Sequence, residues 1–103
     1  MATFAALPVS ASERLWITVY DSWYAGRPTA NGETFNYYGY TAAHPWWPFG
    51  TLVRVSTKRG STVVRINDRC DCSLDLAYGA MRDIGGHSNW SGNARVEVIR
   101  WGR

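Results

Sequence analysis

The sequence predicts a mainly β fold: one small β-barrel with a single short helix. Several segments alternate apolar and polar residues with the period of a strand, turn-forming residues separate them, and one segment has a helical period instead. At 103 residues the chain is large enough for one core and too small for two. Many strands with one short helix favour a barrel and disfavour the helical folds that read DNA.

The first half of the chain is predicted to contain one strand, a loop and a hairpin. Residues 15–24, LWITVYDSWY, are rich in β-branched and aromatic residues and predict a strand. Residues 25–35, AGRPTANGETF, carry the Gly, Pro and Asn-Gly signals of an exposed loop. Residues 50–68 alternate on both sides of Lys58-Arg59-Gly60, which predicts a β-hairpin.

The second half is predicted to hold the helix and a last strand. Residues 73–85, SLDLAYGAMRDIG, change to a helical period that ends at Gly85-Gly86. Residues 94–101, ARVEVIRW, alternate again as a strand. We therefore expect a barrel domain at residues 15–103, preceded by an N-terminal extension at residues 1–14. The helical stripe comprises Leu74, Leu76, Ala77, Ala80, Met81 and Ile84.

The composition narrows the class of partner. A net charge of +3 without a run of like charges suits an anionic partner, such as a cell-wall polymer or nucleic acid, without requiring one. Six Trp and six Tyr are more than a small core needs, so we expect a binding face. No stretch approaches the roughly 18 apolar residues of a membrane span. The opening MATFAALPVSASERLW has no basic residue before its short apolar segment and makes a poor signal peptide.

No common nucleotide-binding or hydrolase motif occurs, and the candidate residues are polar side chains at strand ends and in loops. Asp68 follows the apolar run VVRI, which places it at the rim of the barrel. A carboxyl group held partly out of water has a raised pKa and can act as a general acid. The alternative is that Asn67 and Asp68 only cap the strand end in a turn.

The histidine and tryptophan residues in TAAHPWWPFG allow two interpretations as well. His44 is either a site residue or a structural donor to the backbone beside Pro45, and His87 is expected to face solvent. Adjacent residues on an extended chain point to opposite faces, so at least one of Trp46 and Trp47 should be exposed. An exposed indole can stack on the apolar face of a sugar ring or a nucleobase.

Two cysteines lie two residues apart, at Cys70 and Cys72. On an extended chain their Cα atoms would lie near the upper limit of about 6.8 Å for a disulfide, so a bridge needs a tight bend. We predict two free thiols under mild reductant. Zinc prefers four ligands, and Cys-x-Cys has too few partners, so we expect no metal and no cofactor.

Five segments together resemble the rare lipoprotein A family, over roughly residues 18–100. They are SWYAGRPTANGETF, TAAHPWWPFGTLVRV, VVRINDR, LDLAYGAMRDIG and ARVEVI, in matching order and spacing. The resemblance implies a six-stranded double-psi β-barrel with a pseudo-twofold pair of crossed psi loops. It also implies a groove lined by the Glu of ANGE, the His of TAAH and the Asp of RIND, which makes Glu33, His44 and Asp68 the candidate catalytic residues.

The activity that the resemblance implies is lytic transglycosylation of peptidoglycan, preferentially on glycan strands stripped of stem peptides. Asp68 would first protonate the glycosidic oxygen and then take the proton from the C6 hydroxyl of MurNAc, leaving a 1,6-anhydroMurNAc end without adding water. His44 and Glu33 would position the sugar or tune Asp68. An inverting hydrolase would instead need a second carboxylate about 6.5–9.5 Å away, from Glu33 or Asp75. The expected substrate-binding residues are Trp23, Tyr24, Thr41, Trp46, Trp47, Asn67, Arg69 and Asp75.

Two departures from the family pattern keep other functions open. Residues 67–72, NDRCDC, replace the usual Asn-Asp-Arg-Gly-Pro, and Trp46 and Trp47 replace smaller residues. One alternative is a non-catalytic glycan-binding or wall-loosening module, as expansins are; another is a phage virion protein that keeps the barrel for structure or adhesion. We expect glycan strands as the partner, no nucleic acid, and a location in the cell envelope, periplasm or outside the cell, or in a virion.

Overall fold

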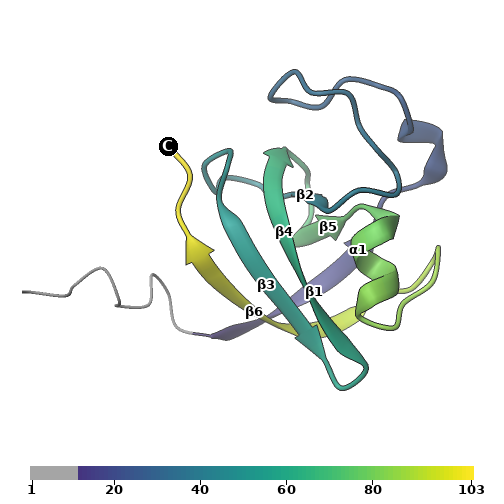
Figure 1. Cartoon of the computed structure of the whole chain (residues 1–103), viewed down its shortest axis with the longest axis vertical. Coiled ribbons are helices and arrows are strands. Elements are labelled where there is room, and N and C mark those ends of the chain that lie inside the picture. The colour runs from purple at the N-terminus through teal and green to yellow at the C-terminus, as the bar shows by residue number, and fades with distance from the viewer. Residues whose placement is uncertain (1–11) are drawn as a thin grey trace, which may run out of the picture.

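The computed structural model of the protein describes residues 12–103 and contains a closed barrel of six strands with one short α-helix (Figure 1). The predicted barrel is therefore confirmed. Part of the predicted N-terminal extension, residues 1–11, lies outside the described residues. The strands are β1 Glu13–Val19, β2 Thr41–Ala43, β3 Leu52–Thr57, β4 Gly60–Asp68, β5 Leu74–Leu76 and β6 Gly92–Arg100, and the helices are the 3₁₀ turn η2 Ser22–Tyr24 and α1 Tyr78–Asp83.

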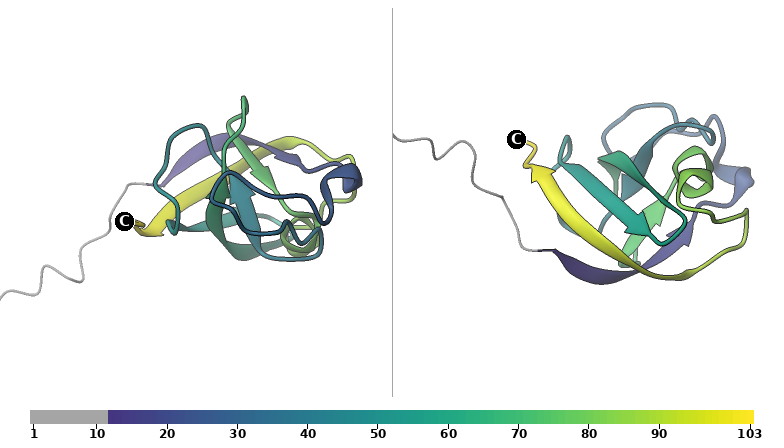
Figure 2. Two further views of the ribbon diagram at one scale, coloured as in Figure 1. Left: turned by 90° about the horizontal axis from the view of Figure 1, so that it is seen from above. Right: turned by 60° about the horizontal axis from the view of Figure 1, so that its bottom comes forward.

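The strand order around the barrel is β1-β5-β2-β4-β3-β6, and β6 closes it by pairing antiparallel with β1. Figure 2 shows β1 and β6 running side by side. The β1–β5 and β2–β4 pairs are parallel, whereas the β3–β4 hairpin is antiparallel. A parallel pair cannot be joined by a tight turn, so the chain must cross over between its strands. These crossovers bring long loops to the end of the barrel at which β4 finishes.

Two parts of the sequence-based prediction are wrong in detail. The first strand ends at Val19, and residues 22–24 form a 3₁₀ turn in which the Asp21 side chain accepts a hydrogen bond of 2.8 Å from the Trp23 N–H. The predicted helix at residues 73–85 is shorter, because Leu74–Leu76 forms β5 between β1 and β2. Pairing with strands distant in sequence outweighs the local helical period there.

The barrel core is built from side chains that alternate inward along the strands. It includes Ile17 from β1, Val55 from β3 and Ile66 from β4, and Met81 of α1 covers it. A second buried cluster around Tyr20 lies under the loop of residues 25–40, which arches over one end of the barrel (Figure 1). The two clusters hold that loop and the barrel together.

Close packing fixes the loop of residues 25–40 at two places. The ring of Phe35 stacks on that of Tyr20 with centroids 4.1 Å apart. A Cβ atom added to Gly79 of α1 would collide with the carbonyl group of Tyr38, so only glycine lets the helix approach the loop this closely. No helix within residues 12–103 is long and apolar enough to cross a membrane.

The two ends of the barrel differ in what they carry. The end at which β4 finishes, with the loops of residues 20–40, 44–51 and 69–73, is called the loop end below. The end at which the turn of Lys58 and Arg59 joins β3 to β4 is called the hairpin end. Nearly all predicted site residues lie at the loop end.

Candidate functional site

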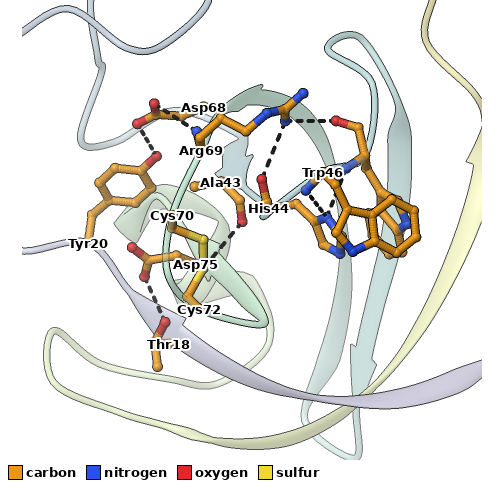
Figure 3. Close-up of a disulfide and its surroundings, with 11 residues drawn as sticks. Thr18, Tyr20, Ala43, His44, Trp46, Asp68, Arg69, Cys70, Cys72 and Asp75 are labelled. Carbon is orange, nitrogen blue, oxygen red and sulfur yellow. Dashed lines mark hydrogen bonds between the residues drawn. A yellow bond between two sulfur atoms is a disulfide. The ribbon is translucent and has the colours of Figure 1, made fainter.

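Asp68 is the last residue of β4, and three donors hold its half-buried carboxyl group in place. Its Oδ1 accepts hydrogen bonds from the backbone N–H groups of Ala30, at 2.7 Å, and Arg69, at 2.9 Å. Its Oδ2 accepts one from the Tyr20 hydroxyl at 2.8 Å (Figure 3). Two distant segments of the chain and the residue that follows Asp68 therefore fix the group at the rim position predicted from VVRI.

Tyr20 was not among the predicted site residues. It is buried at the end of β1, and burial, followed by its hydrogen bond to Asp68, raises the pKa of its hydroxyl group. The phenol therefore stays protonated at neutral pH and acts as the donor to Asp68. In the sequence, Tyr20 resembles any other aromatic residue of an apolar strand, so no local signal distinguishes it.

A second carboxyl group, Asp75 of β5, lies in the same region. Its Oδ1 accepts a hydrogen bond of 2.8 Å from the hydroxyl of Thr18, its partner on β1 (Figure 3). Burial raises its pKa, and the negative charge of Asp68 adds to that increase, while the bond from Thr18 opposes it. A carboxyl group with a raised pKa beside a second carboxyl group is a frequent arrangement for acid–base chemistry.

Glu33 lies apart from these two carboxyl groups. Its Oε2 accepts a hydrogen bond of 3.0 Å from Arg65, and its Oε1 accepts one of 2.9 Å from the Asn67 amide. The bond from Arg65, followed by that from Asn67, lowers the pKa of Glu33, so this side chain is ionised at neutral pH. Asn67 lies at a shift of register between β2 and β4. The donors to Glu33 differ from those to Asp68, which are Tyr20, Ala30 and Arg69.

Glu33 lines a pocket of about 400 Å³ together with two predicted substrate-binding residues, Thr41 and Asn67. Tyr40 and Arg65, which were not predicted, line it too. The Asn67 side chain is almost fully buried, and its Oδ1 has no hydrogen-bond partner among the described residues. A buried acceptor without a partner is unusual in a folded protein. The structure thus places three predicted residues in one polar recess.

His44 follows β2, and its backbone N–H donates a hydrogen bond of 3.2 Å to the carbonyl oxygen of Asp68. Its ring Nδ1 accepts from the N–H groups of Trp46, at 3.1 Å, and Trp47, at 3.0 Å (Figure 3). Burial, followed by the charge of Arg69, lowers the pKa of His44 to about 4. His44 is therefore neutral with its hydrogen on Nε2. The structural alternative expected the ring to donate to the backbone, whereas the ring accepts from it here.

Arg69 ties the turn at residues 44–49 to the end of β4. Its guanidinium donates to the carbonyl oxygens of His44, at 3.3 Å, and Trp47, at 2.8 Å. The same group lies 4.0 Å from the ring centroid of Phe49, a distance suited to a cation–π contact. Arg69, which is predicted to bind substrate, thus also braces the turn.

The two adjacent tryptophans separate as the alternation predicted. Trp46 is 69% exposed, while Trp47 is 4% exposed, belongs to the core, and stacks on the His44 ring at 3.8 Å. Only Trp46 therefore offers a free indole face. Trp23 and Tyr24 are also exposed, at 60% and 47%, and the guanidinium of Arg27 covers one face of Trp23 at 3.5 Å.

Cys70 and Cys72 form a disulfide in the loop after β4 (Figure 3). Their Cα atoms are 5.2 Å apart, within the usual range for a bridge, so the prediction of two free thiols is wrong for this structure. The prediction assumed an extended chain, but the chain bends at Asp71 and Cys72. Within residues 12–103, no group of three His, Cys, Asp or Glu side chains is arranged to hold a metal ion.

Comparison with known proteins gives a consistent set of relatives. The family model described as lytic transglycolase matches residues 17–98. The probable endolytic peptidoglycan transglycosylase RlpA of Synechocystis sp. is 47% identical over 89 residues, which cover 77% of this chain and 28% of that protein. The endolytic peptidoglycan transglycosylase RlpA of Pseudomonas aeruginosa is 41% identical over 87 residues, which cover 75% of this chain and 25% of that protein.

A shorter relative matches over most of its length. An uncharacterized protein of Synechocystis sp. is 45% identical over 69 residues, which cover 65% of this chain and 77% of that protein. By contrast, this chain spans between 25% and 28% of the two RlpA proteins described above.

Proposed function

Because the chain belongs to the lytic transglycolase family of double-psi β-barrels, we propose that it cleaves peptidoglycan glycan strands by lytic transglycosylation. The family predicted from the five sequence segments, and its double-psi fold, are confirmed. The observation that carries the proposal is the carboxyl group of Asp68, fixed by three donors at the end of the barrel where Glu33 and His44 also lie. The activity in the names of the RlpA proteins supports it.

The reaction needs one proton to be given and then taken back. The acid form of Asp68 would protonate the oxygen that links MurNAc to GlcNAc while the bond to MurNAc C1 breaks. The resulting carboxylate would accept the proton of the MurNAc C6 hydroxyl, whose oxygen closes the 1,6-anhydro ring on C1. No water is consumed, so the products are the leaving GlcNAc hydroxyl and an anhydro end.

Asp75 is a carboxyl group at this end of the barrel whose pKa is shifted. Its pKa is raised mainly by burial, and the negative charge of Asp68 adds to the increase. The raised pKa of Asp75 means that a proton is retained in this region at higher pH than on an ordinary carboxyl group. We infer that Asp68, at the end of β4 on the rim of the barrel, exchanges the proton with the sugar.

Glu33 and His44 fit positioning roles. Both oxygens of Glu33 are engaged, by Arg65 and Asn67, so Glu33 is poorly placed to activate the water that an inverting hydrolase needs. The Nδ1 of His44 is occupied, and no hydrogen bond from its Nε2 is formed to any residue in the part of the chain that the structure describes. We propose that Nε2–H donates to an oxygen of the glycan.

Trp46 adds a surface for stacking at this end of the barrel. A sugar ring on its exposed indole would contribute about 1–3 kcal/mol, by analogy with bases stacked on aromatic residues. Since peptidoglycan is the proposed substrate, we also propose a location in the cell envelope. The similar proteins favour neither a phage virion role nor a non-catalytic, expansin-like role.

The test is Asp68→Asn, which keeps the shape of the side chain and removes its titratable proton. We expect purified denuded sacculi to yield 1,6-anhydroMurNAc ends with the wild-type chain, and a loss of at least the 10²–10⁴-fold typical of general acid–base catalysis with the variant. Asp83→Asn, on α1 and outside the site, is the control. New reducing ends would replace the proposal with hydrolysis, and no release from any glycan would refute an enzymatic function.

A further inference from the structure

A second and larger cavity lies at the hairpin end, where the proposed mechanism uses no residue. Its volume is about 780 Å³, within the usual range of ligand pockets. It lies near the start of β4, whereas Asp68 is the last of the nine residues of that strand. At about 3.3 Å per residue, the two sites are separated by roughly 27 Å. The residues of interest are Arg14, Lys58, Arg59, His87, Trp90 and Arg95, and they are called the basic pocket below.

Two arginines of the basic pocket lie directly opposite each other on neighbouring strands. Arg14 of β1 is the cross-strand partner of Arg95 of β6, and both side chains are exposed on the outer face of the barrel. Directly opposed side chains have Cβ atoms about 4.5–5.5 Å apart, and like charges in this position destabilise a sheet. Ser56 of β3 continues the same row beyond Arg95.

Among the described residues, these charges have no compensating carboxylate. Within residues 12–103, no Asp or Glu oxygen lies within 4.0 Å of a charged nitrogen of Arg14, Lys58 or Arg95, and no acidic residue lines the cavity. Glu97 lies two residues after Arg95 on β6, and it forms an ion pair of 3.3 Å with its cross-strand partner Arg54. The barrel therefore neutralises one cation of this surface and leaves the adjacent ones without a partner.

The fourth cation, Arg59, is fixed along the wall of the cavity. Its guanidinium donates a hydrogen bond of 3.4 Å to the carbonyl oxygen of Gly85, and its aliphatic chain packs on that residue. Gly85 has a φ of +85°, and a Cβ atom there would collide with the Arg59 side chain. Trp90, which is partly exposed, supplies apolar surface beside the cations. The cavity thus combines four permanent positive charges with an apolar wall.

We propose that the basic pocket binds the free carboxylates of peptidoglycan stem peptides, an inference that rests on the proposed function. Arginine and lysine bind carboxylate groups through charge-assisted hydrogen bonds. The apolar surface of Trp90 suits the short alkyl side chains that lie between the carboxylates of such a peptide, whereas a phosphodiester chain offers no equivalent group. One barrel would then hold a peptide-bearing strand at the hairpin end and a stripped strand at the loop end.

The experiment is an NMR titration of the ¹⁵N-labelled chain with two matched muropeptides, GlcNAc-MurNAc-tetrapeptide and the same disaccharide without peptide. We expect GlcNAc-MurNAc-tetrapeptide, but not the disaccharide, to shift the Trp90 indole signal and the backbone signals of residues 56–59. The double variant Lys58→Gln/Arg95→Gln should weaken its binding about tenfold. The control Arg54→Gln/Arg100→Gln removes the same charge outside the pocket and should change binding less than twofold. Higher salt should weaken wild-type binding.

Three outcomes would overturn the inference. Equal shifts with the disaccharide would indicate a neutral sugar site. Binding of pyrophosphate ten times tighter than that of the tetrapeptide compound would indicate a phosphate site. The third outcome is that no signal at the hairpin end shifts. A variant that unfolds is recognised by its spectrum, and the single variants Lys58→Gln and Arg95→Gln then replace it. The titration measures no cleavage, so failure of the proposed enzymatic activity would leave its result intact.

Discussion

The polar side chains at the two ends of β4 differ in whether they have partners within the chain. At the loop end, the side chains of Asp68, Glu33 and Arg69 each have at least two hydrogen bonds to other parts of the chain. At the hairpin end, Arg14 and Arg95 face each other with no carboxylate of residues 12–103 within reach. The loop end is organised by its own contacts before any ligand arrives, while the hairpin end carries charge that only an external partner can neutralise. Substitutions should therefore destabilise the first end and spare the second.

The largest effect on stability is expected for Trp47→Ala at the loop end. Trp47 is buried, stacks on His44 and contacts Trp101 edge to face, so its loss should lower the free energy of unfolding by about 3–5 kcal/mol. Its exposed neighbour provides the control, because Trp46→Ala should change stability by only about 0.5 kcal/mol while weakening binding to sacculi. Urea unfolding and pull-down assays measure the two effects. Similar stability losses for both variants would contradict the assignment.

The next largest effect is a loss of stability at low pH that is due to His44. Its pKa of about 4 in the folded chain lies below the usual 6.5, so the unfolded chain takes up a proton first as pH falls. The neutral His44 ring contributes up to about 3 kcal/mol to the free energy of unfolding. This contribution is complete above pH 6.5 and is lost as the pH falls from about 6.5 to 4. His44→Asn keeps an acceptor for the two tryptophan N–H groups but cannot titrate. Urea midpoints at pH 7 and pH 4.5 should diverge between the two proteins, and parallel curves would contradict this cause.

A smaller effect is expected for Tyr20→Phe. The variant keeps the ring stacked on Phe35 and removes one donor to the Asp68 carboxylate, so stability should fall by about 1–2 kcal/mol. If Tyr20 positions Asp68, the alkaline limb of the pH–activity profile should also move to higher pH, because the reaction starts from the acid form and the carboxylate loses a stabilising bond. Tyr24→Phe, at an exposed hydroxyl, is the control. A stability loss without any change in the profile would leave Tyr20 with a packing role alone.

The smallest effect, of opposite sign, is expected at the hairpin end. Arg14→Gln removes a like-charge pair and should raise the free energy of unfolding by a few tenths of a kcal/mol at low salt. The gain should disappear at 1 M salt, where charges are screened within about 3 Å. Arg54→Gln breaks the pair with Glu97 and should not stabilise. A loss of stability in Arg14→Gln at low salt would show that the pocket cations are compensated after all.

The sequence predicts the elements whose signals are local. The hairpin of β3 and β4 and the last strand, β6, alternate clearly and were found. Strands β2 and β5 have only three residues each and exist because longer, distant strands pair with them, so no local pattern reveals them. The disulfide was missed for a related reason, because the bend that brings Cys70 and Cys72 together depends on where the chain must turn into β5.

The site residues also differ in whether local sequence or distant contacts determine their positions. The position of Asp68 at the rim follows from the apolar run before it, and the alternation of Trp46 and Trp47 predicts that one of them is exposed. Which of the two is exposed depends on the turn that Arg69 braces, and this involves residues far apart in sequence. The hydrogen bonds from Asn67 to Glu33 and from Ala30 to Asp68 depend on how the loop of residues 25–40 crosses β4.

The closure of the barrel through β1 also determines how the chain can fold. Ile17 of β1 pairs with Leu74 of β5, and Glu13 pairs with Val96 of β6, so the first strand has no partner until almost the whole chain is present. The β3–β4 hairpin can form early from neighbouring residues, whereas closure must bring distant segments together, which typically takes milliseconds to seconds. During that time the apolar face and edge of β1 remain exposed to other chains. The time that β1 needs to pair with β6 therefore determines both the folding rate and how long the chain is most prone to aggregate.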